Sequence, residues 1–173
     1  MNVMIDIETL GNVPGSAILS IGAYCIETEE TFYREIELAS CFEAKLSVDA
    51  DTISWWFKQG EKAKELFNSQ EAIPLGTALE NLSTFLGKYK PLKVYGNGSS
   101  FDMTLLEVAY RRVKKKCPWG YMNIRDLRTV CDFYPEIKRP KNDLKHNSLT
   151  DAIAQGKQLK EILEKHRGRI SGI

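Results

Sequence analysis

The sequence predicts an α/β fold in which a mixed β-sheet is flanked by helices, because β-rich runs fill the start of the chain and helical patterns follow. The runs 17–26 and 31–38 are rich in β-branched and aromatic residues, and the polar segment 27–30 separates them, a pattern typical of an antiparallel meander. A short strand at 92–96 then leads into a helix from about Ser100. Parallel pairing of that strand with the first strand requires a crossover, which helices supply.

The first strand is predicted over the apolar run that starts at Val3, and it carries two carboxylates near its end, Asp6 and Glu8. Residues two apart on a strand point to the same side, so the two acids share one face. Burial of paired anions is costly unless cations neutralise them. The pair therefore predicts a divalent metal site at the strand end, although acids where a strand frays into water have the same spacing.

Helical patterns bring two more acids to the ends of elements. Behind Pro74, apolar residues recur at spacings of three and four as far as Tyr89, which predicts an amphipathic helix. A second apolar stripe begins at Leu149 and predicts a last helix that packs across the sheet, with Asp151 in its first turn. Asp102 lies in the first turn of the helix that follows the short strand, where it can face the acids of the first strand.

Length and composition agree with one compact domain. The chain has 173 residues, 43% of them hydrophobic, which suffices for one core. Its formal net charge of +1 and pI near 7.6 exclude a globally basic nucleic-acid binder, so contact with a polyanion must use a local patch and bound metal. The four cysteines lack C-x-x-C spacing, and no apolar run approaches the roughly 20 residues that span a bilayer. We expect reduced thiols, no membrane contact and a cytoplasmic location.

Three motifs in order give the chain a family resemblance. They are D-x-E at Asp6 and Glu8, an aspartate after an N-x-x-x-F stretch at Asp102, and H-x-x-x-x-D at His146 and Asp151. Together they resemble the DEDDh branch of the proofreading-exonuclease and RNase T superfamily, over residues 3 to about 160.

Two further details refine this resemblance. The sister branch has a tyrosine four residues before the last aspartate, where this chain has Asn147. The segments 52–56 and 125–129 resemble those of small phage-type exonucleases and adenylate-selective exoribonucleases.

The resemblance implies an RNase H-like fold with a mixed five-stranded sheet, an antiparallel meander plus parallel strands, flanked by helices. It implies one exonuclease domain over 1–173, with its core at about 3–166 and a short tail at 167–173. The implied activity is 3′-5′ hydrolysis of single-stranded DNA or RNA to nucleoside monophosphates, so 3′ ends are the expected partners. Small nucleases without a separate binding domain often dimerise, and we also expect a homodimer. The choice between DNA and RNA depends on local contacts to the 2′-hydroxyl that the sequence does not reveal.

The chemistry requires several acids for a physical reason. Two metal ions stabilise the attacking and the leaving oxygen of an in-line displacement, and four carboxylates match two divalent cations in charge. Oxygen ligands without cysteine or a histidine pair suit Mg²⁺ or Mn²⁺. We expect Asp6 and Asp151 to hold the ion that activates the water, with Glu8 shared near it and Asp102 on the second ion. His146 is expected to be the general base, since a neutral imidazole accepts a proton near neutral pH.

Expected substrate contacts come from several segments. Thr9, Leu10 and Gly11 follow the first strand, where backbone amides can hold the terminal sugar while Leu10 packs against the last base. Trp55 and Trp56 are about 100° apart on a helix, so either one stacks on a base, or one lies in the core and the other at the surface. The expected set also includes Asn97, Phe101 and Arg128, and the basic loop residues Lys138, Arg139, Lys141 and Lys145.

Structural interpretations compete with these assignments. Ser148 and Asp151 form S-x-x-D, so Asp151 can be read as the acidic member of a capping box, and Ser99 or Ser100 can cap the helix that holds Asp102. Arg128 can belong to an internal ion-pair network.

Two other classes of protein stay open as well. One is a haloacid-dehalogenase-type phosphatase in which Asp6 forms an aspartyl phosphate, although that family expects Asp where Glu8 stands. The other is a non-catalytic nucleic-acid-binding module on an exonuclease fold. The order of four acids and a histidine, each at an element end, favours the exonuclease.

Overall fold

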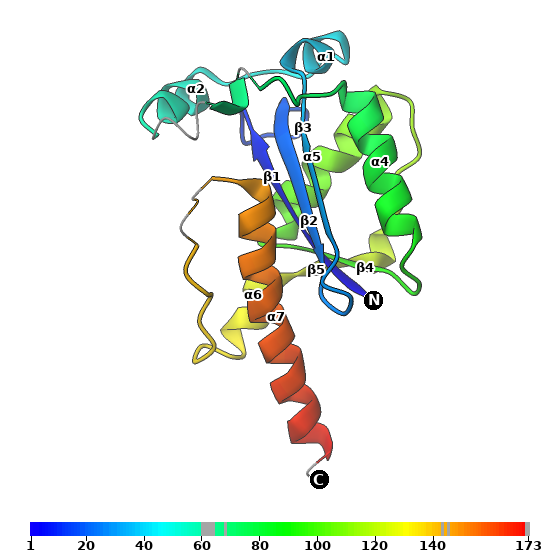
Figure 1. The fold of residues 1–173 in the computed structure, drawn as a ribbon, viewed down its shortest axis with the longest axis vertical. Helices are drawn as coiled ribbons and strands as arrows, with labels where there is room; N and C mark the ends of the chain where they lie inside the picture. The colour runs from blue at the N-terminus through cyan, green and yellow to red at the C-terminus, as the bar shows by residue number, and fades with distance from the viewer. Residues whose placement is uncertain (60–64, 68, 143, 145, 172–173) are drawn as a thin grey trace.

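One mixed sheet forms the centre of the molecule. The computed structural model describes residues 1–173 apart from 60–64, 68, 143, 145 and 172–173. Within them, five strands pair in the order β3-β2-β1-β4-β5. The strands are β1 (Asn2–Thr9), β2 (Ile18–Cys25), β3 (Thr31–Glu35), β4 (Lys93–Gly96) and β5 (Ile124–Asp126). The first three form an antiparallel meander, and β4 and β5 run parallel to β1 (Figure 1), which confirms the predicted fold class.

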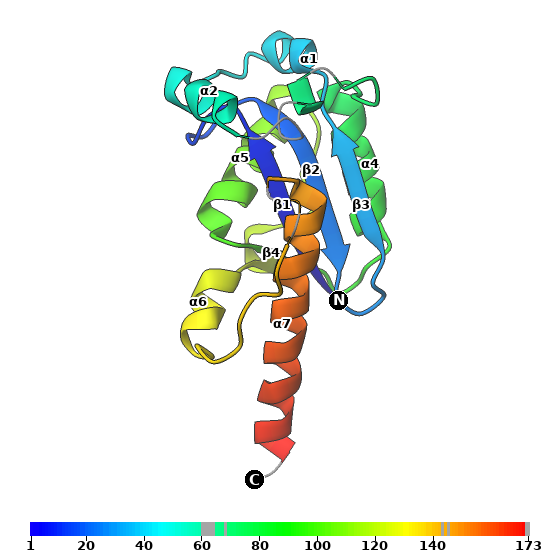
Figure 2. The same ribbon diagram turned by 60° about the vertical axis from the view of Figure 1, so that its left-hand side comes forward.

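Helices cover both faces of this sheet. The α-helices are α1 (Leu38–Glu43), α2 (Ala50–Phe57), α4 (Leu75–Gly87), α5 (Ser99–Arg112), α6 (Leu127–Asp132) and α7 (Ser148–Ser171), with short 3₁₀ turns η1 (Glu65–Phe67) and η2 (Tyr121–Asn123). Figures 1 and 2 show α7 crossing one face while α4 and α5 lie behind the other. Helix α7 continues to Ser171, so the expected tail is helical to that point. No described helix is long and apolar enough to cross a membrane.

The alternation of β1 separates two cores. Val3, Ile5 and Ile7 join the larger core, which also contains apolar residues of α4 and α5. Met4 points the other way, into a smaller core with residues of α6 and α7. Because residues two apart share a face, Asp6 and Glu8 extend the Met4 row on the side of α7.

Two glycines let α7 approach the sheet closely. A Cβ on Gly22 would lie 2.3 Å from backbone atoms of Ser148, and a Cβ on Gly156 would lie 2.4 Å from the ring of Tyr24. Gly22 is the cross-strand partner of Asp6. The missing side chain at position 22 therefore allows the first turn of α7 to lie directly over the acidic part of β1.

Replacement of Gly22 by alanine is expected to lower the free energy of unfolding by about 3 kcal/mol, because the backbone of α7 must move to admit the methyl group. Gly87→Ala is the matched control, since a Cβ there meets nothing within 4 Å. Denaturant unfolding of both variants measures the effect. Equal midpoints for Gly22→Ala and the wild type would contradict this account of how α7 is positioned.

Candidate active site

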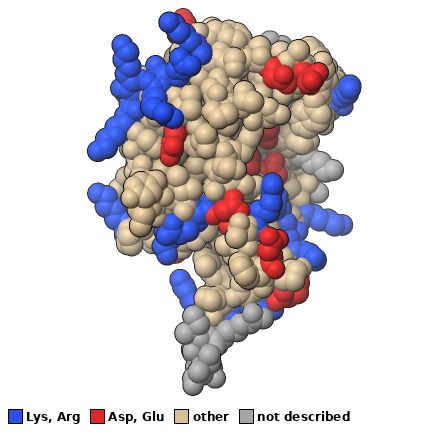
Figure 3. Space-filling model, turned by 180° about the vertical axis from the view of Figure 1, so that it is seen from behind, with Lys and Arg blue, Asp and Glu red and all other residues tan. Residues whose placement is uncertain are grey.

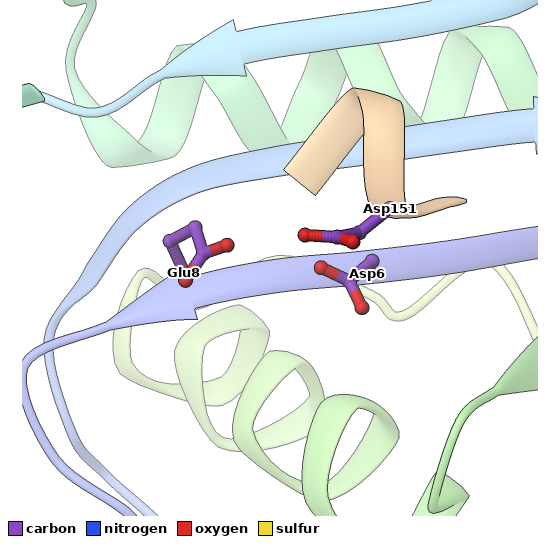
Figure 4. Close-up of side chains that lie close together, drawn as sticks. All are labelled: Asp6, Glu8 and Asp151. Carbon is purple, nitrogen blue, oxygen red and sulfur yellow. The ribbon is translucent and has the colours of Figure 1, made fainter. Parts of the chain in front are cut away.

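Three carboxylates converge where β1 meets the start of α7. Asp6, Glu8 and Asp151 each offer an oxygen atom, and these atoms all lie within 4.8 Å of one another. Figure 4 shows Asp151 reaching from the first turn of α7 toward the two acids of β1. Acids that are 145 residues apart in sequence, Asp6 and Asp151, thus form one cluster.

The start of α7 is held by neighbours other than the expected capping box. Asn147, not Ser148, caps the helix, because its Oδ1 accepts the backbone N–H of Thr150 at 3.1 Å. Ser148 is fully buried and its hydroxyl lies 2.9 Å from that of Ser20 on β2. The capping-box interpretation is therefore wrong for Ser148, and the carboxylate of Asp151 accepts a hydrogen bond from Asn142 at 3.0 Å.

Asp102 lies beside the cluster but is not one of the three converging acids. It is 4% exposed in the first turn of α5, close to Gly96, where a Cβ would lie 2.8 Å from Asp102 Oδ2. Neither serine caps α5 as the sequence suggested, since Gly98 is the cap residue. Instead, Asp126 Oδ2 accepts the N–H of Ser99 at 2.6 Å.

Asp126 serves the starts of two helices at once. Its other oxygen, Oδ1, accepts the backbone N–H of Thr129 in α6 at 2.8 Å. The alternative interpretation, an ion-pair network of Arg125 and Arg128 around Asp126, is wrong for the described residues, since no ion pair with Asp126 occurs among them. One carboxylate therefore fixes the turn of α5 that carries Asp102.

Burial, and secondarily the charges of nearby groups, raise the pKa values of Asp6, Glu8 and Asp102. Burial, followed by the charges of Asp151 and Asp102, raises the pKa of Glu8 to about 8. Burial raises the pKa of Asp102 to about 7, and it also raises the pKa of Asp6 well above the usual range. No described Lys or Arg forms an ion pair with these side chains. A hard divalent cation fits such a set of crowded oxygen donors.

Gln155 was missed by sequence reasoning and is the nearest polar support of the cluster. It lies one helical turn after Asp151, is 3% exposed, and donates from Nε2 to Asp6 Oδ1 at 2.8 Å. Its Oε1 is buried without a hydrogen-bond partner among the described residues. Its spacing of four from Asp151 was the available signal, since residues four apart share a helix face.

His146 lies in an aromatic corner. Its ring centroid is 4.7 Å from that of Trp55 and 6.1 Å from that of Trp56, with both pairs edge to face. Its φ is +61°, a left-handed conformation that is uncommon for a non-glycine residue and occurs often at functional sites. One tryptophan lies in the core and the other at the surface, as one of the two interpretations predicted: Trp56 is 1% exposed, and Trp55 is 40% exposed.

Part of the expected substrate pocket is buried. Leu10 is 1% exposed and belongs to the larger core, so its side chain faces apolar neighbours rather than solvent. Thr9 is also buried; its hydroxyl donates to the carbonyl of Gly11 at 2.7 Å, and its own carbonyl accepts Trp56 Nε1–H at 2.9 Å. Phe101 packs partly against the same core. These contacts give the segment after β1 a structural role.

Arginines bracket the loop before α5. Arg128 Nη2 donates to the carbonyl of Asn97 at 3.1 Å, and Arg139 Nη2 donates to Asn97 Oδ1 at 2.8 Å. The positive charge of Arg128 lowers the pKa of Asp102, although burial outweighs it. Figure 3 shows Lys and Arg gathered in groups on one face, with acidic side chains between them. The positive charge of this near-neutral chain is thus concentrated in local patches. Lys145 lies outside the described residues.

A family model matches almost the whole chain. The model described as "3′-5′ exoribonuclease Rv2179c-like domain" matches residues 1–163. No curated protein sequence matches the chain.

Several solved exonuclease structures share the fold. The nuclease domain of 3′hExo, a DEDDh family member bound to rAMP, has 15% identity and a TM-score of 0.66, covering 95% of this chain and 92% of that one. Exonuclease X in complex with 5′ overhanging duplex DNA has 15% identity and a TM-score of 0.58, with the same coverage. E. coli Exonuclease I in complex with a dT13 oligonucleotide has 14% identity and a TM-score of 0.62, covering 94% of this chain but 40% of that one.

Proposed function

Because this chain belongs to the family of 3′-5′ exoribonuclease Rv2179c-like domains, and is thus a 3′-5′ exonuclease, we propose that it removes nucleotides from single strands at the carboxylate cluster of Asp6, Glu8 and Asp151. This cluster is the observation that carries the proposal. Its acids come from two elements, β1 and α7, and burial together with the charges of neighbouring acids raises the pKa values of Asp6 and Glu8, which a bound cation would counteract.

We propose that Asp6, Glu8 and Asp151 hold one divalent cation and that Asp102 helps to hold a second, with Mg²⁺ or Mn²⁺ the fitting ions. When bound, such ions supply charge stabilisation for the attacking and leaving oxygens of phosphodiester hydrolysis. Gln155 orients the carboxylate of Asp6 by its hydrogen bond, the role that groups around a metal site commonly have toward a ligand.

His146 is proposed as the general base that takes the proton of the attacking water. Its edge-to-face contact with Trp55 and its left-handed backbone restrict the ring to a small range of positions. The exposed Trp55 offers a surface on which a base can stack. Arg128 and Arg139, which both donate hydrogen bonds to Asn97 just before α5, are proposed to bind phosphates of the strand.

Single-stranded RNA is the first substrate to test, because the family is described as exoribonucleases. Two structural relatives support single nucleotides and single strands as ligands of this fold: 3′hExo was solved with rAMP and Exonuclease I with dT13. A homodimer and a cytoplasmic location stay predictions. Membership in the exonuclease family disfavours the phosphatase alternative, which would require a phosphoenzyme.

A block at the 3′ terminus is expected to stop degradation, whereas a block at the 5′ terminus is not. The test uses matched single-stranded RNA and DNA, labelled internally and carrying a phosphate at one end, with Mg²⁺ or with EDTA. Stepwise release of nucleoside monophosphates only from free 3′ ends with Mg²⁺ supports the proposal. Rapid cleavage of a circular strand, or tight binding without any metal-dependent product, would overturn it.

A further inference from the structure

A pocket of about 310 Å³ lies beside the acidic cluster, between the outer side of α7 and the residues Pro140, Lys141, Asn142 and Leu144. On α7, Thr150, Ile153 and Lys157 line it at spacings of three and four, which makes them one helical stripe. Asp151 and Gln155 lie on the neighbouring stripe, which faces β1. The pocket and the cluster are therefore adjacent sides of the same helical turns.

The wall of the pocket combines positive charge with apolar surface. Lys141 and Lys157 line it from opposite elements, and no acidic side chain is among its described lining residues. Neither lysine forms an ion pair with any part of the chain that the structure describes. Leu144, which is 42% exposed, and Ile153 supply apolar contact area. This combination suits an anion that carries a flat apolar group.

Asn142 joins the pocket to the acidic cluster. It lines the pocket, and its Nδ2 donates both to Asp151 Oδ1 and to Thr150 Oγ1 at 3.0 Å. Its Oδ1 accepts the backbone N–H of Leu144 at 3.0 Å. One side chain thus separates a lysine-lined pocket from a proposed metal ligand, so a strand whose 3′ end lies at Asp151 can reach the pocket by passing a single residue.

We propose that this pocket is a nucleotide subsite, in which Lys141 and Lys157 bind a phosphate of the substrate strand and Leu144 and Ile153 contact its base or sugar. The volume lies at the lower end of the range for small-ligand pockets, which fits one nucleotide unit. The inference rests on the proposed function, because it takes the occupant to be part of the strand being degraded. It assigns the part of the strand away from the 3′ end to the Lys157 side of α7.

The test measures binding of a fluorescent eight-nucleotide RNA to an Asp102→Asn background by anisotropy at several salt concentrations. The Lys141→Ala/Lys157→Ala double variant is expected to bind about tenfold more weakly, with a salt slope smaller by about 0.7 for each lysine removed. Lys160→Ala is the matched control, one turn further along α7, where the lysine pairs with Glu29 at 2.7 Å. An unchanged affinity and salt slope in the double variant would overturn the subsite.

Two further arms identify the occupant and separate this inference from the proposed function. If free nucleoside monophosphate displaces the octamer from the control but not from the double variant, the released product also binds in this subsite. If it displaces the octamer from neither, the subsite binds only the substrate strand. In the wild-type background the double variant should raise KM for the octamer more than KM for a dinucleotide, whereas Lys160→Ala should change neither value. If the wild-type protein degrades neither the octamer nor the dinucleotide, the proposed function is wrong. The comparison of octamer affinity between the double variant and the control still tests whether the pocket binds RNA.

Discussion

Asp102→Asn is expected to lower turnover by about 10³-fold or more while the protein stays folded, because charge stabilisation by bound metal is worth several kcal/mol and each 1.36 kcal/mol is tenfold in rate. The substitution keeps the shape of a buried side chain and removes only its charge. Asp6→Asn should behave in the same way. Rates of nucleotide release from end-labelled RNA at saturating Mg²⁺ measure the loss.

The same substitution is expected to stabilise the metal-free protein at alkaline pH. The folded-state pKa of Asp102 is raised to about 7, so its favourable contribution is present below the unfolded pKa near 4 and is lost as pH rises to about 7. Asparagine has no such charge. In EDTA at pH 8 the variant should therefore unfold with a free energy about 2–4 kcal/mol above that of the wild type, and the difference should shrink toward pH 4.

Asp132→Asn is the control for both measurements, since it makes the same change in net charge at an exposed position in α6. Added Mg²⁺ should raise the melting temperature of the wild type and of this control more than that of Asp102→Asn. If Asp102→Asn kept wild-type turnover, or if it were less stable than the control in EDTA at pH 8, the carboxylate would not belong to a metal-dependent site.

His146→Ala is expected to lose about 10²–10⁴-fold in the chemical step, the usual contribution of a positioned general base. Binding of Mg²⁺ to the acids should survive, because no described contact joins His146 to them. A protonated imidazole cannot accept a proton from water, so the wild-type rate should fall toward acidic pH. In His146→Ala the rate should depend less on pH over this range, because the imidazole is absent. Single-turnover rates across pH, with metal binding by calorimetry, test the assignment.

His166→Ala is the natural comparison, because it removes the only other histidine of the chain. The Nδ1 of His166 lies 2.6 Å from the hydroxyl of Tyr134, in the part of α7 away from the acidic cluster, and its loss should leave the pH profile unchanged. A wild-type rate and acidic limb in His146→Ala would assign water activation to other groups. The proposed carboxylate site would remain intact in that case.

The exposure of the two tryptophans shows how far local patterns reach. Adjacent residues on a helix point about 100° apart, so the sequence predicted that Trp55 and Trp56 could not share one face. It did not say which one is buried. That depended on the carbonyl of Thr9, which accepts the indole N–H of Trp56 across 47 residues of sequence.

The sequence by itself determined the features that follow from short-range geometry. Strand alternation placed Asp6 and Glu8 on one face, and the apolar stripe from Leu149 placed Asp151 in a first helical turn; both depend only on neighbouring dihedral angles. The meander and the helix behind Pro74 follow from the same kind of periodicity.

Only the tertiary structure decided how these pieces meet. The three-residue strand β5 is too short to produce a pattern. The hydrogen bond from Ser99 to Asp126, the packing of Leu10 into the larger core and the hydrogen bond from Gln155 to Asp6 all join segments that are far apart in sequence. Such contacts depend on which surfaces pack together, and a methyl group at Gly22 would collide with the backbone of Ser148 at the start of α7. Residue spacing thus predicted which acids could form a site, and the close approach of α7 to β2 determined that three of them converge.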